Sequence, residues 1–134
     1  MQVNIRPYNH SDYNMICGWW NSHNEQSPLP GMMVENGTFI YEYDGIPVMS
    51  LTVFITQSSI GYIEGYISNP EIDPSYKKIC GPDLWNHCFK WAQDNGVKHL
   101  LTYTNKFPLV KRYESFGMTK AIDNLTGLFR NVGV

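Results

Sequence analysis

The sequence predicts one α/β domain of the α+β type over residues 1–134, built on a mixed, mostly antiparallel sheet of six to seven strands with helices on both faces. Two observations predict it. The first half of the chain alternates strand-like segments with turn signals, which is typical of antiparallel hairpins. In the second half, a helical segment joins two strand-like segments, and a crossover of that length makes the two strands parallel neighbours or nearly so.

The first elements follow from local patterns. Val3–Pro7 alternates weakly and is expected to be a short strand. Ser11 is then expected to cap a helix, because its hydroxyl can accept from the first unpaired amides. The core-facing stripe of this helix has the spacing i, i+3, i+4 and i+7 and consists of Tyr13, Ile16, Cys17 and Trp20. Trp19 lies off the stripe, and residues 21–31, with two prolines and a glycine, form a loop.

A meander of three antiparallel strands comes next. Thr38–Tyr43 is the first strand, and residues 46–56 return from it. Asp44-Gly45 between them is a strong hairpin signal, because both residues tolerate positive φ. The third strand is Ile60–Ser68, in which Gly65 marks a bulge.

The second half of the chain is expected to start a helix at Gly81-Pro82-Asp83, with proline in the first turn. The apolar stripe of this helix consists of Leu84, Cys88, Trp91 and Ala92, and Asn95-Gly96 ends it. The remaining expected elements are a strand over residues 97–104, a helix opened by Pro108 and stopped at Gly117, and a terminal pair of strands over residues 118–132 around Asp123-Asn124.

Composition narrows the function classes. The 134 residues carry a net charge of -2, which excludes a basic nucleic-acid coat or a polybasic membrane anchor as the main plan. The chain lacks an apolar run long enough to span a membrane and a signal-peptide start, so we expect a soluble protein. Three cysteines without a CxxC pair favour a reducing cytoplasm, and the four histidines lack metal-site spacing, so no metal is expected.

An anion site is one interpretation of the segment that joins Ile60–Ser68 to the next helix. A loop that enters a helix presents unpaired amides and the positive end of the helix dipole. Lys77 and Lys78 add positive charge there. The alternative is an ordinary connector with two solvated lysines.

Several local strings resemble the GNAT superfamily of acetyl-CoA-dependent N-acyltransferases, over nearly the whole chain. The segment from Pro74 to Gly81, PSYKKICG, resembles the family's pyrophosphate loop, P-x-Y-R-x-x-G-x-G/A. Asn105 and the later string YESFGM from Tyr113 resemble its N…Y-E-x-x-G-F segment. More narrowly, the chain resembles a poorly characterised phage and bacterial branch, through Trp19-Trp20, Leu29-Pro30 with Gly37, the strings SSIGYIEGYISNP from Ser58 and PLVKRY from Pro108.

This resemblance implies acetyl-CoA or CoA as the acyl donor. In GNAT folds the pantetheine arm enters where two parallel strands splay apart and pairs with the backbone of one of them, here Tyr66, Ile67 and Ser68. The implied pyrophosphate segment is Tyr76, Lys77, Lys78, Ile79, Cys80 and Gly81, and Asn105 is the implied side-chain contact. The chain departs from the pattern in its missing glycines and in Pro82, which has no amide to donate.

The resemblance also implies the catalytic residues. Glu64 is the candidate base that takes a proton from the acceptor amine, with Glu42 as the reserve, and Tyr113 is the candidate acid for the leaving thiolate. Strand alternation puts Tyr62, Glu64 and Tyr66 on one face, where partial desolvation would raise the pKa of the carboxyl. The alternatives are a solvent-facing acid for Glu64 and a core tyrosine for Tyr113. A cysteine nucleophile is not expected, because Cys80 and Cys88 have no suitably placed histidine partner.

Aromatic and apolar residues are the candidates for the acceptor side. They are Trp19, Leu29, Tyr41 and Tyr62, with Tyr43 and Tyr66 as further members, and Trp20 is assigned to the core. Loops often carry specificity, so residues 21–31 are expected to contact the acceptor or to cover it. The alternative for each residue is ordinary packing in a surface connector.

The resulting prediction is an N-acyltransferase that moves an acyl group, acetyl by expectation, to a primary amine of a small molecule or peptide by direct transfer in a ternary complex. The acceptor and the length of the acyl group stay open. No nucleic-acid or membrane partner is expected, and a homodimer is compatible with the resemblance. The alternative is a degenerate GNAT fold that binds a protein or a small molecule without catalysis.

Overall fold

The computed structural model describes residues 2–104, 106–122, 126–128, 130 and 132–133. The chain divides into two compact units, Met1–Tyr103 and Thr104–Val134. The first unit contains all the strands of the described residues and two α-helices, and the second contains one α-helix. None of the helices among the described residues meets the length and hydropathy needed to cross a membrane. The predicted single domain over residues 1–134 stays a prediction.

The sheet has five strands in the order of the sequence. They are β1 (Val3–Pro7), β2 (Thr38–Tyr43), β3 (Ile46–Ile55), β4 (Ile60–Ser68) and β5 (His99–Leu101). Neighbours from β1 to β4 are antiparallel, whereas β4 and β5 are parallel. The predicted mixed, mostly antiparallel sheet is therefore confirmed, and so is the crossover between its last two strands.

The predicted count of six to seven strands is wrong. The described residues of the segment 118–132 form no strand, and Asp123 and Asn124 lie outside the described residues. The apolar side chains of Ile122, Leu128 and Val132 are 65%, 95% and 88% exposed. A strand is stabilised by a partner and a buried face, and these side chains have no buried face to contribute.

The hairpin between β2 and β3 forms as predicted. Asp44 and Gly45 have φ values of +50° and +79°, the positive pair that a two-residue type I′ turn requires. The Asp44 amide also donates to the Gln2 carbonyl at 2.7 Å, so β1 is tied to the same turn.

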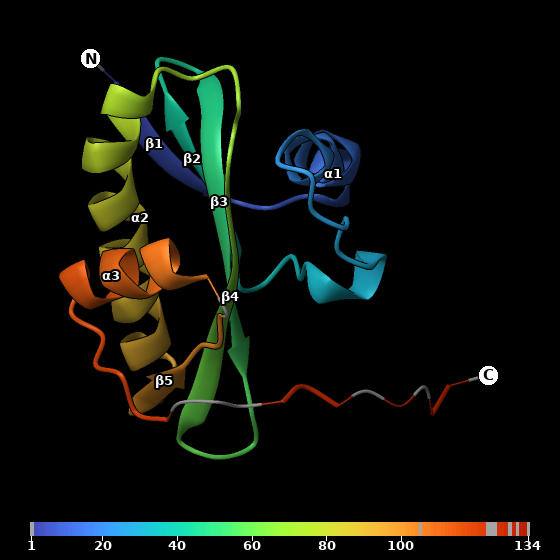
Figure 1. Cartoon of the computed structure of the whole chain (residues 1–134), viewed down its shortest axis with the longest axis vertical. Coiled ribbons are helices and arrows are strands. Elements are labelled where there is room, and N and C mark those ends of the chain that lie inside the picture. The colour runs from blue at the N-terminus through green and yellow to red at the C-terminus, as the bar shows by residue number, and fades with distance from the viewer. Residues whose placement is uncertain (1, 105, 123–125, 129, 131, 134) are drawn as a thin grey trace. The chain divides into compact units, whose positions relative to one another are not determined.

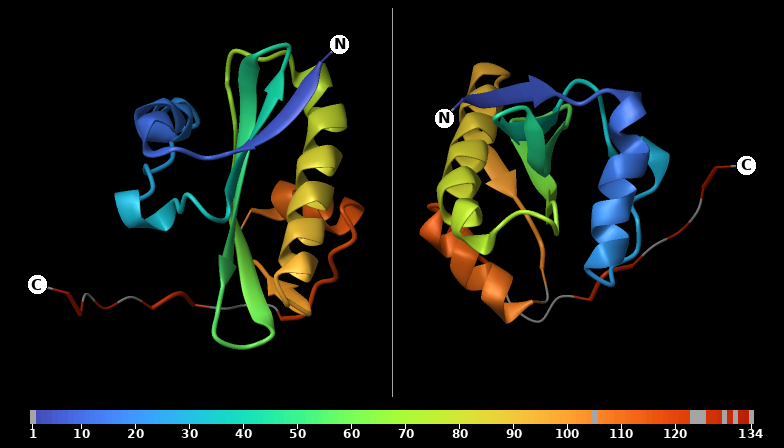
Figure 2. Two further views of the ribbon diagram at one scale, coloured as in Figure 1. Left: turned by 180° about the vertical axis from the view of Figure 1, so that it is seen from behind. Right: turned by 90° about the horizontal axis from the view of Figure 1, so that it is seen from above.

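Two helices cover opposite faces of the sheet, α1 (Tyr13–Ser22) and α2 (Pro74–Asp94), as Figures 1 and 2 show. Asn9, and not Ser11, caps the first of them through the short helix η1 (His10–Asp12). Its side chain accepts from the Ser11 amide at 3.0 Å, and its own amide donates to Asp12 at 2.9 Å. Ser11 is therefore a donor in this cap, because the cap lies two residues earlier than predicted.

The predicted start of α2 at Gly81 is also wrong. The helix begins at Pro74, and Asp73 caps it by accepting from the Ser75 amide at 2.9 Å. Asp73-Pro74 combines a preferred cap residue with proline at the first helical position, which is a stronger start signal than Pro82. Pro82 lies inside the helix. The predicted end at Asn95-Gly96 is confirmed, with Asn95 as the C-cap.

The α1 face of the sheet buries Trp19 and not Trp20. Trp19 is 6% exposed, whereas Trp20 is half-buried and packs at the margin of the cluster. The cluster consists of Tyr8, Ile16, Trp19, Met33, Ile40 and Ile67. The predicted core-facing stripe is wrong at Trp20, because Ile16 and Trp19, three residues apart, are the pair that faces the sheet.

On the other face, α2 packs its apolar side on the strands. Cys80, Leu84, Trp85 and Cys88 are each at most 1% exposed. Phe39 on β2 meets Trp91 edge-on, with ring centroids 5.3 Å apart. The predicted stripe is confirmed for Leu84, Cys88 and Ala92, while Trp91 is half-buried.

Gly37, just before β2, provides a test of the packing. Its φ is +141°, and a Cβ there would lie 2.5 Å from the Val53 carbonyl oxygen. Gly37→Ala should therefore lower the free energy of unfolding by about 2 kcal/mol or more, measured by chemical denaturation. Gly31→Ala is the control, because a Cβ at that position would have no atom within 4 Å and its φ lies outside the left-handed region. Equal stability of the two variants would contradict the close approach at Gly37.

Candidate functional site

The parallel strands β4 and β5 pair over only three positions. Ile60 lies opposite His99, Gly61 opposite Leu100 and Tyr62 opposite Leu101, and no further pair between these strands occurs in the described part of the chain. The pairing ends at Tyr62 and Leu101, and we call this end of the sheet, between β4 and the segment that follows β5, the fork. The expected splay of the two strands stays a prediction.

A bulge at Gly65 shapes the β4 side of the fork. Thr52 lies opposite Glu64 and Ser50 opposite Ile67, so one residue of β3 faces two residues of β4. Gly65 has a φ of +73°, which a glycine adopts without strain. The predicted bulge at Gly65 is confirmed.

The bulge changes which side chains share a face. Ile67 belongs to the cluster under α1. Tyr66 instead turns toward α2, where its ring centroid lies 5.5 Å from that of Trp85. The predicted face of Tyr62, Glu64 and Tyr66 is thus wrong at Tyr66, because the extra residue reverses the alternation after Glu64.

Glu64 lies at the fork in surroundings almost without charge. It is the only charged residue of β4, and the sequences of β3 and α1 contain none. Burial raises the pKa of its carboxyl from 4.5 to about 7, while interactions with the Tyr103 backbone and the Thr102 side chain oppose that rise. The raised pKa agrees with the prediction, although burial and not a second tyrosine causes it. A carboxyl with this pKa exchanges protons readily near neutral pH.

The reserve base Glu42 has a different environment. Its carboxylate accepts from Arg6 Nε at 3.0 Å and from the Asn4 side-chain amide at 3.1 Å. Arg6 also forms a two-pronged pair with Asp12, at 2.9 Å for each bond. Glu42 is therefore part of an ion-pair network that joins β1, β2 and η1, which is a structural arrangement.

The predicted acceptor residues divide between the two faces of the sheet. Tyr62 is two residues from Glu64, before the bulge, and pairs with Phe54. Leu29 is 60% exposed in the loop before the short helix η2 (Pro30–Met32), and Trp19, on α1, is buried against the sheet. Tyr41 lies on the α2 face, where its hydroxyl donates to Asp83 at 3.0 Å. The structure therefore does not bring Tyr41 to the face that carries Glu64.

The predicted pyrophosphate segment is helical. Residues 76–81 form part of the first two turns of α2 and not a loop, and Cys80 and Gly81 are buried against the sheet. Tyr76 and Ile79 are 39% and 54% exposed. Two amides of the first turn are already paired, since Ser75 donates to the Asp73 carboxylate and Tyr76 to the Asp73 carbonyl at 3.0 Å.

The remaining predicted cofactor contacts lie elsewhere. The Ser68 carbonyl accepts from His23 Nε2 at 3.1 Å, which ties the end of β4 to the residue after α1. Tyr113 is buried in α3 (Phe107–Ser115), close to the end of that helix. Asn105 lies outside the described residues. A cysteine nucleophile stays unexpected, because burial raises the pKa of the Cys80 and Cys88 thiols.

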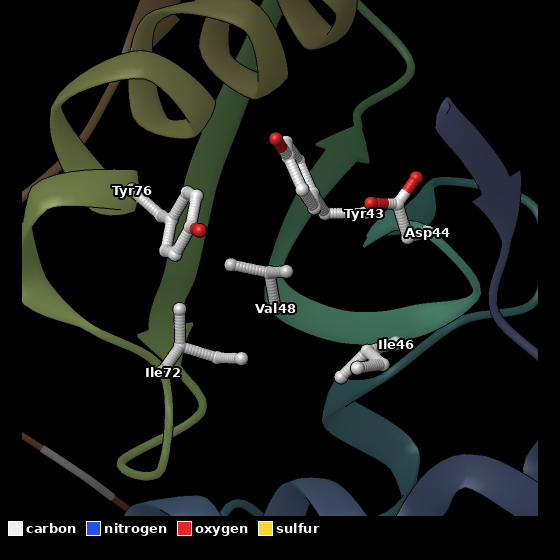
Figure 3. Close-up of a pocket in the computed structure, with 6 residues that line it drawn as sticks. All are labelled: Tyr43, Asp44, Ile46, Val48, Ile72 and Tyr76. Atoms are coloured by element: carbon white, nitrogen blue, oxygen red, sulfur yellow. The ribbon is translucent and has the colours of Figure 1, made fainter. Parts of the chain in front are cut away.

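A pocket of about 220 Å³ opens on the α2 side of the sheet, between the β2–β3 hairpin and the start of α2 (Figure 3). Its walls are mainly apolar and consist of Tyr43, Asp44, Ile46, Val48, Ile72 and Tyr76. The rings of Tyr43 and Tyr76 are 5.0 Å apart. Of the predicted cofactor residues only Tyr76 lines it.

Thr102 and Tyr103 are the neighbours of Glu64 that the sequence did not single out. A usable signal exists, because both directly follow the apolar pair Leu100-Leu101 and therefore stand where the last strand leaves the sheet. Predicting their approach to Glu64 would have required the parallel register, which the sequence pattern does not supply.

No family model matches the chain, and no curated protein is similar in sequence. Solved structures do share its fold. An acetyltransferase from Trypanosoma brucei aligns with a TM-score of 0.68 at 20% identity, covering 96% of this chain and 100% of that one. Glucosamine-6-phosphate N-acetyltransferase from Arabidopsis thaliana aligns at 0.71 and 13%, covering 97% and 100%. Rv2747 from Mycobacterium tuberculosis, solved with CoA, aligns at 0.65 and 14%, covering 83% and 70%. The chain therefore has the fold of GNAT acetyltransferases.

The buried carboxyl of Glu64 makes stability depend on pH. Because its folded pKa of about 7 is above the ordinary 4.5, its stabilising contribution is complete below about pH 4.5 and is lost as the pH rises to about 7. Glu64→Gln removes this titration. As the pH rises from 4.5 to 8, the free energy of unfolding of the variant should increase relative to that of the natural protein by about 1–2 kcal/mol, a range that allows for the partial exposure of Glu64. Denaturant unfolding at both pH values measures this gain, and a pH-independent difference would contradict the buried carboxyl.

Proposed function

We propose that the chain is an acyl-CoA-dependent N-acyltransferase that moves an acetyl group from acetyl-CoA to a primary amine. The observation that carries the proposal is Glu64, a half-buried carboxyl whose pKa is about 7, at the fork of an acetyltransferase fold. Glucosamine-6-phosphate N-acetyltransferase and the CoA complex among the similar structures support this donor and this class of acceptor.

Two features bear on binding of the donor. The fork agrees with the family pattern, and the start of α2 departs from it. Past Tyr62, β4 has no further pair with β5 among the described residues, so the backbone of Tyr66 to Ser68 is the proposed partner of the pantetheine arm. The helical segment at the start of α2 lacks the glycine-rich loop of the family pattern. Lys77 and Lys78 are therefore the proposed contacts of the pyrophosphate.

Catalysis follows from the charge that each step creates. An acceptor ammonium has a pKa near 10 and must lose a proton before it can attack. Glu64 takes this proton, directly or through water, and the neutral amine forms a C–N bond with the thioester carbon. The C–S bond then breaks, and Tyr113 donates a proton to the departing thiolate. Transfer is direct, without an acyl-enzyme, and acetyl-CoA supplies the activated acyl group.

Helical structure in the predicted pyrophosphate segment favours one alternative, a GNAT fold that binds a protein or a small molecule without catalysis. The two functions differ in CoA binding. The three free cysteines favour a reducing compartment, so the proposed location is the cytoplasm. The phage or bacterial origin and a homodimer stay predictions of the resemblance.

CoA binding is the first test. A ligand that binds only the folded state raises the melting temperature, so millimolar CoA should stabilise the protein in a thermal-shift assay. Lys77→Glu combined with Lys78→Glu should weaken that shift, because both changes add negative charge where the pyrophosphate is proposed. Lys98→Glu, beyond the other end of α2, is the control and should keep it. No shift with the natural protein would rule out the proposed function.

The release of CoA from acetyl-CoA, measured across a screen of amines, tests the two proposed catalytic residues. Tyr113→Phe removes one hydroxyl and should lower turnover by roughly 10²–10⁴-fold with little change in CoA affinity. Glu64→Gln should lower the rate most at neutral pH, and raising the pH should partly restore it because more acceptor is already neutral. If both variants keep the rates of the natural protein across the pH range, Tyr113 and Glu64 have structural roles and not catalytic ones.

A further inference from the structure

The backbone of β4 has one edge that faces β3 and one edge on the side of the fork. The register at the end of the strand shows which groups belong to which edge, because the Asn69 amide donates to the Val48 carbonyl at 2.7 Å. In an antiparallel ladder, successive residues direct their backbone groups to alternate sides. The amide and carbonyl of Ser68, which lies opposite Met49 in the same register, therefore point away from β3. This carbonyl belongs to the backbone segment proposed to pair with the pantetheine arm.

The Ser68 carbonyl already has a hydrogen-bond donor. His23 Nε2 lies 3.1 Å from its oxygen, and because a carbonyl oxygen can only accept, the imidazole donates. This is the distance of an ordinary N–H···O hydrogen bond, and an added strand would place its own amide nitrogen equally far from the same oxygen. The imidazole therefore occupies a pairing position on the open edge of β4.

The fold determines where His23 lies. As the C-cap of α1, its amide donates to the Trp19 and Trp20 carbonyls at 3.2 and 3.1 Å. Trp19 packs in one cluster with Ile67, the residue before Ser68. The side chain of His23 is exposed, and exposed side chains change rotamer within nanoseconds. The backbone of His23 is thus fixed by the cap, whereas its ring can turn away without disturbing the buried cluster.

We propose that His23 is a gate on the open edge of β4, whose imidazole competes with the pantetheine arm for the Ser68 carbonyl and turns away when the arm pairs there. The identity of the competing ligand rests on the proposed function. The hydrogen bond that the gate uses belongs to the chain itself. Because the net contribution of one such hydrogen bond is small, the gate lowers the affinity for the donor severalfold and does not abolish binding.

The contact is tested first in the free protein. His23→Ala keeps the amide that caps α1 and removes the imidazole. His23→Gln is the matched control, because its side-chain nitrogen also donates and is as many bonds from Cα as Nε2 of histidine. In carbon-13 spectra the carbonyl signal of Ser68 should shift in His23→Ala and stay close to its natural position in His23→Gln. An unmoved Ser68 signal in His23→Ala would overturn the gate, and this measurement needs no CoA.

Competition is tested by titrating the natural protein and both variants with CoA in a calorimeter. His23→Ala should bind CoA roughly two- to tenfold more tightly than the natural protein, because no hydrogen bond has to break first. His23→Gln should bind it as the natural protein does. Equal binding by His23→Ala would overturn the gate, and so would weaker binding, which would make His23 a contact of the donor. No binding by the natural protein or by His23→Ala would refute the proposed function, and the gate with it.

Discussion

The extra residue at Gly65 is the constraint on which the arrangement of both faces depends. With regular alternation, Tyr66 would share the α1 face with Glu64, and Ile67 would point toward α2. The bulge reverses this order, so Ile67 completes the cluster around Trp19 and Tyr66 reaches Trp85. A φ of +73° costs a glycine little but strains any residue with a Cβ. Glycine at this position therefore lets β4 direct Ile67 toward α1 and Tyr66 toward α2. The same bulge leaves Glu64 as the last residue of β4 before the change of face, beside the fork.

Electrostatics at the fork follow from what surrounds the carboxyl. A surface glutamate is ionised at neutral pH and is a weak base, whereas burial without a charged partner raises the pKa of a carboxyl. Glu42 shows the paired case, since Arg6 and Asn4 bind its carboxylate and fix it in a network. Glu64 shows the unpaired case, in which burial dominates and the neighbouring donors only moderate it. The two glutamates of this sheet thus differ in chemistry. Arg6 on β1 pairs with Glu42 on β2, whereas Glu64 is the only charged residue of β4 and β3 contains none.

Patterns of a few adjacent residues predict the main turn, the bulge and one helix end. The remaining features depend on contacts between residues far apart in the sequence. The hairpin at Asp44-Gly45, the bulge at Gly65 and the end of α2 at Asn95-Gly96 each depend on the φ preferences of a few adjacent residues, which the sequence shows directly. The start of α2 was misplaced because Pro82 resembles a first-turn proline, although Asp73-Pro74 provides the capped start. Trp19 and Trp20 were exchanged because a helical stripe leaves the rotation of a helix uncertain by one residue until its partner surface is known. The resemblance, together with the strand position, made Glu64 the candidate base, whereas the approach of Thr102 and Tyr103 to its carboxyl depends on contacts between distant parts of the sequence.

The start of α2 decides how an anion could be held there. A helix N-terminus binds anions through unpaired amides, but Pro74 has no amide, and those of Ser75 and Tyr76 already donate to Asp73. The carboxylate of Asp73 supplies the negative charge that a phosphate would otherwise bring, and its pKa is lowered by the Ser75 amide. A pyrophosphate at this end of α2 would therefore have to displace Asp73 or rely on the side chains of Lys77 and Lys78. Lysine contacts at an exposed surface are screened by salt, while amide contacts in a buried loop are not. On the proposed function, donor binding by this chain should consequently weaken with ionic strength more steeply than binding through a glycine-rich loop would.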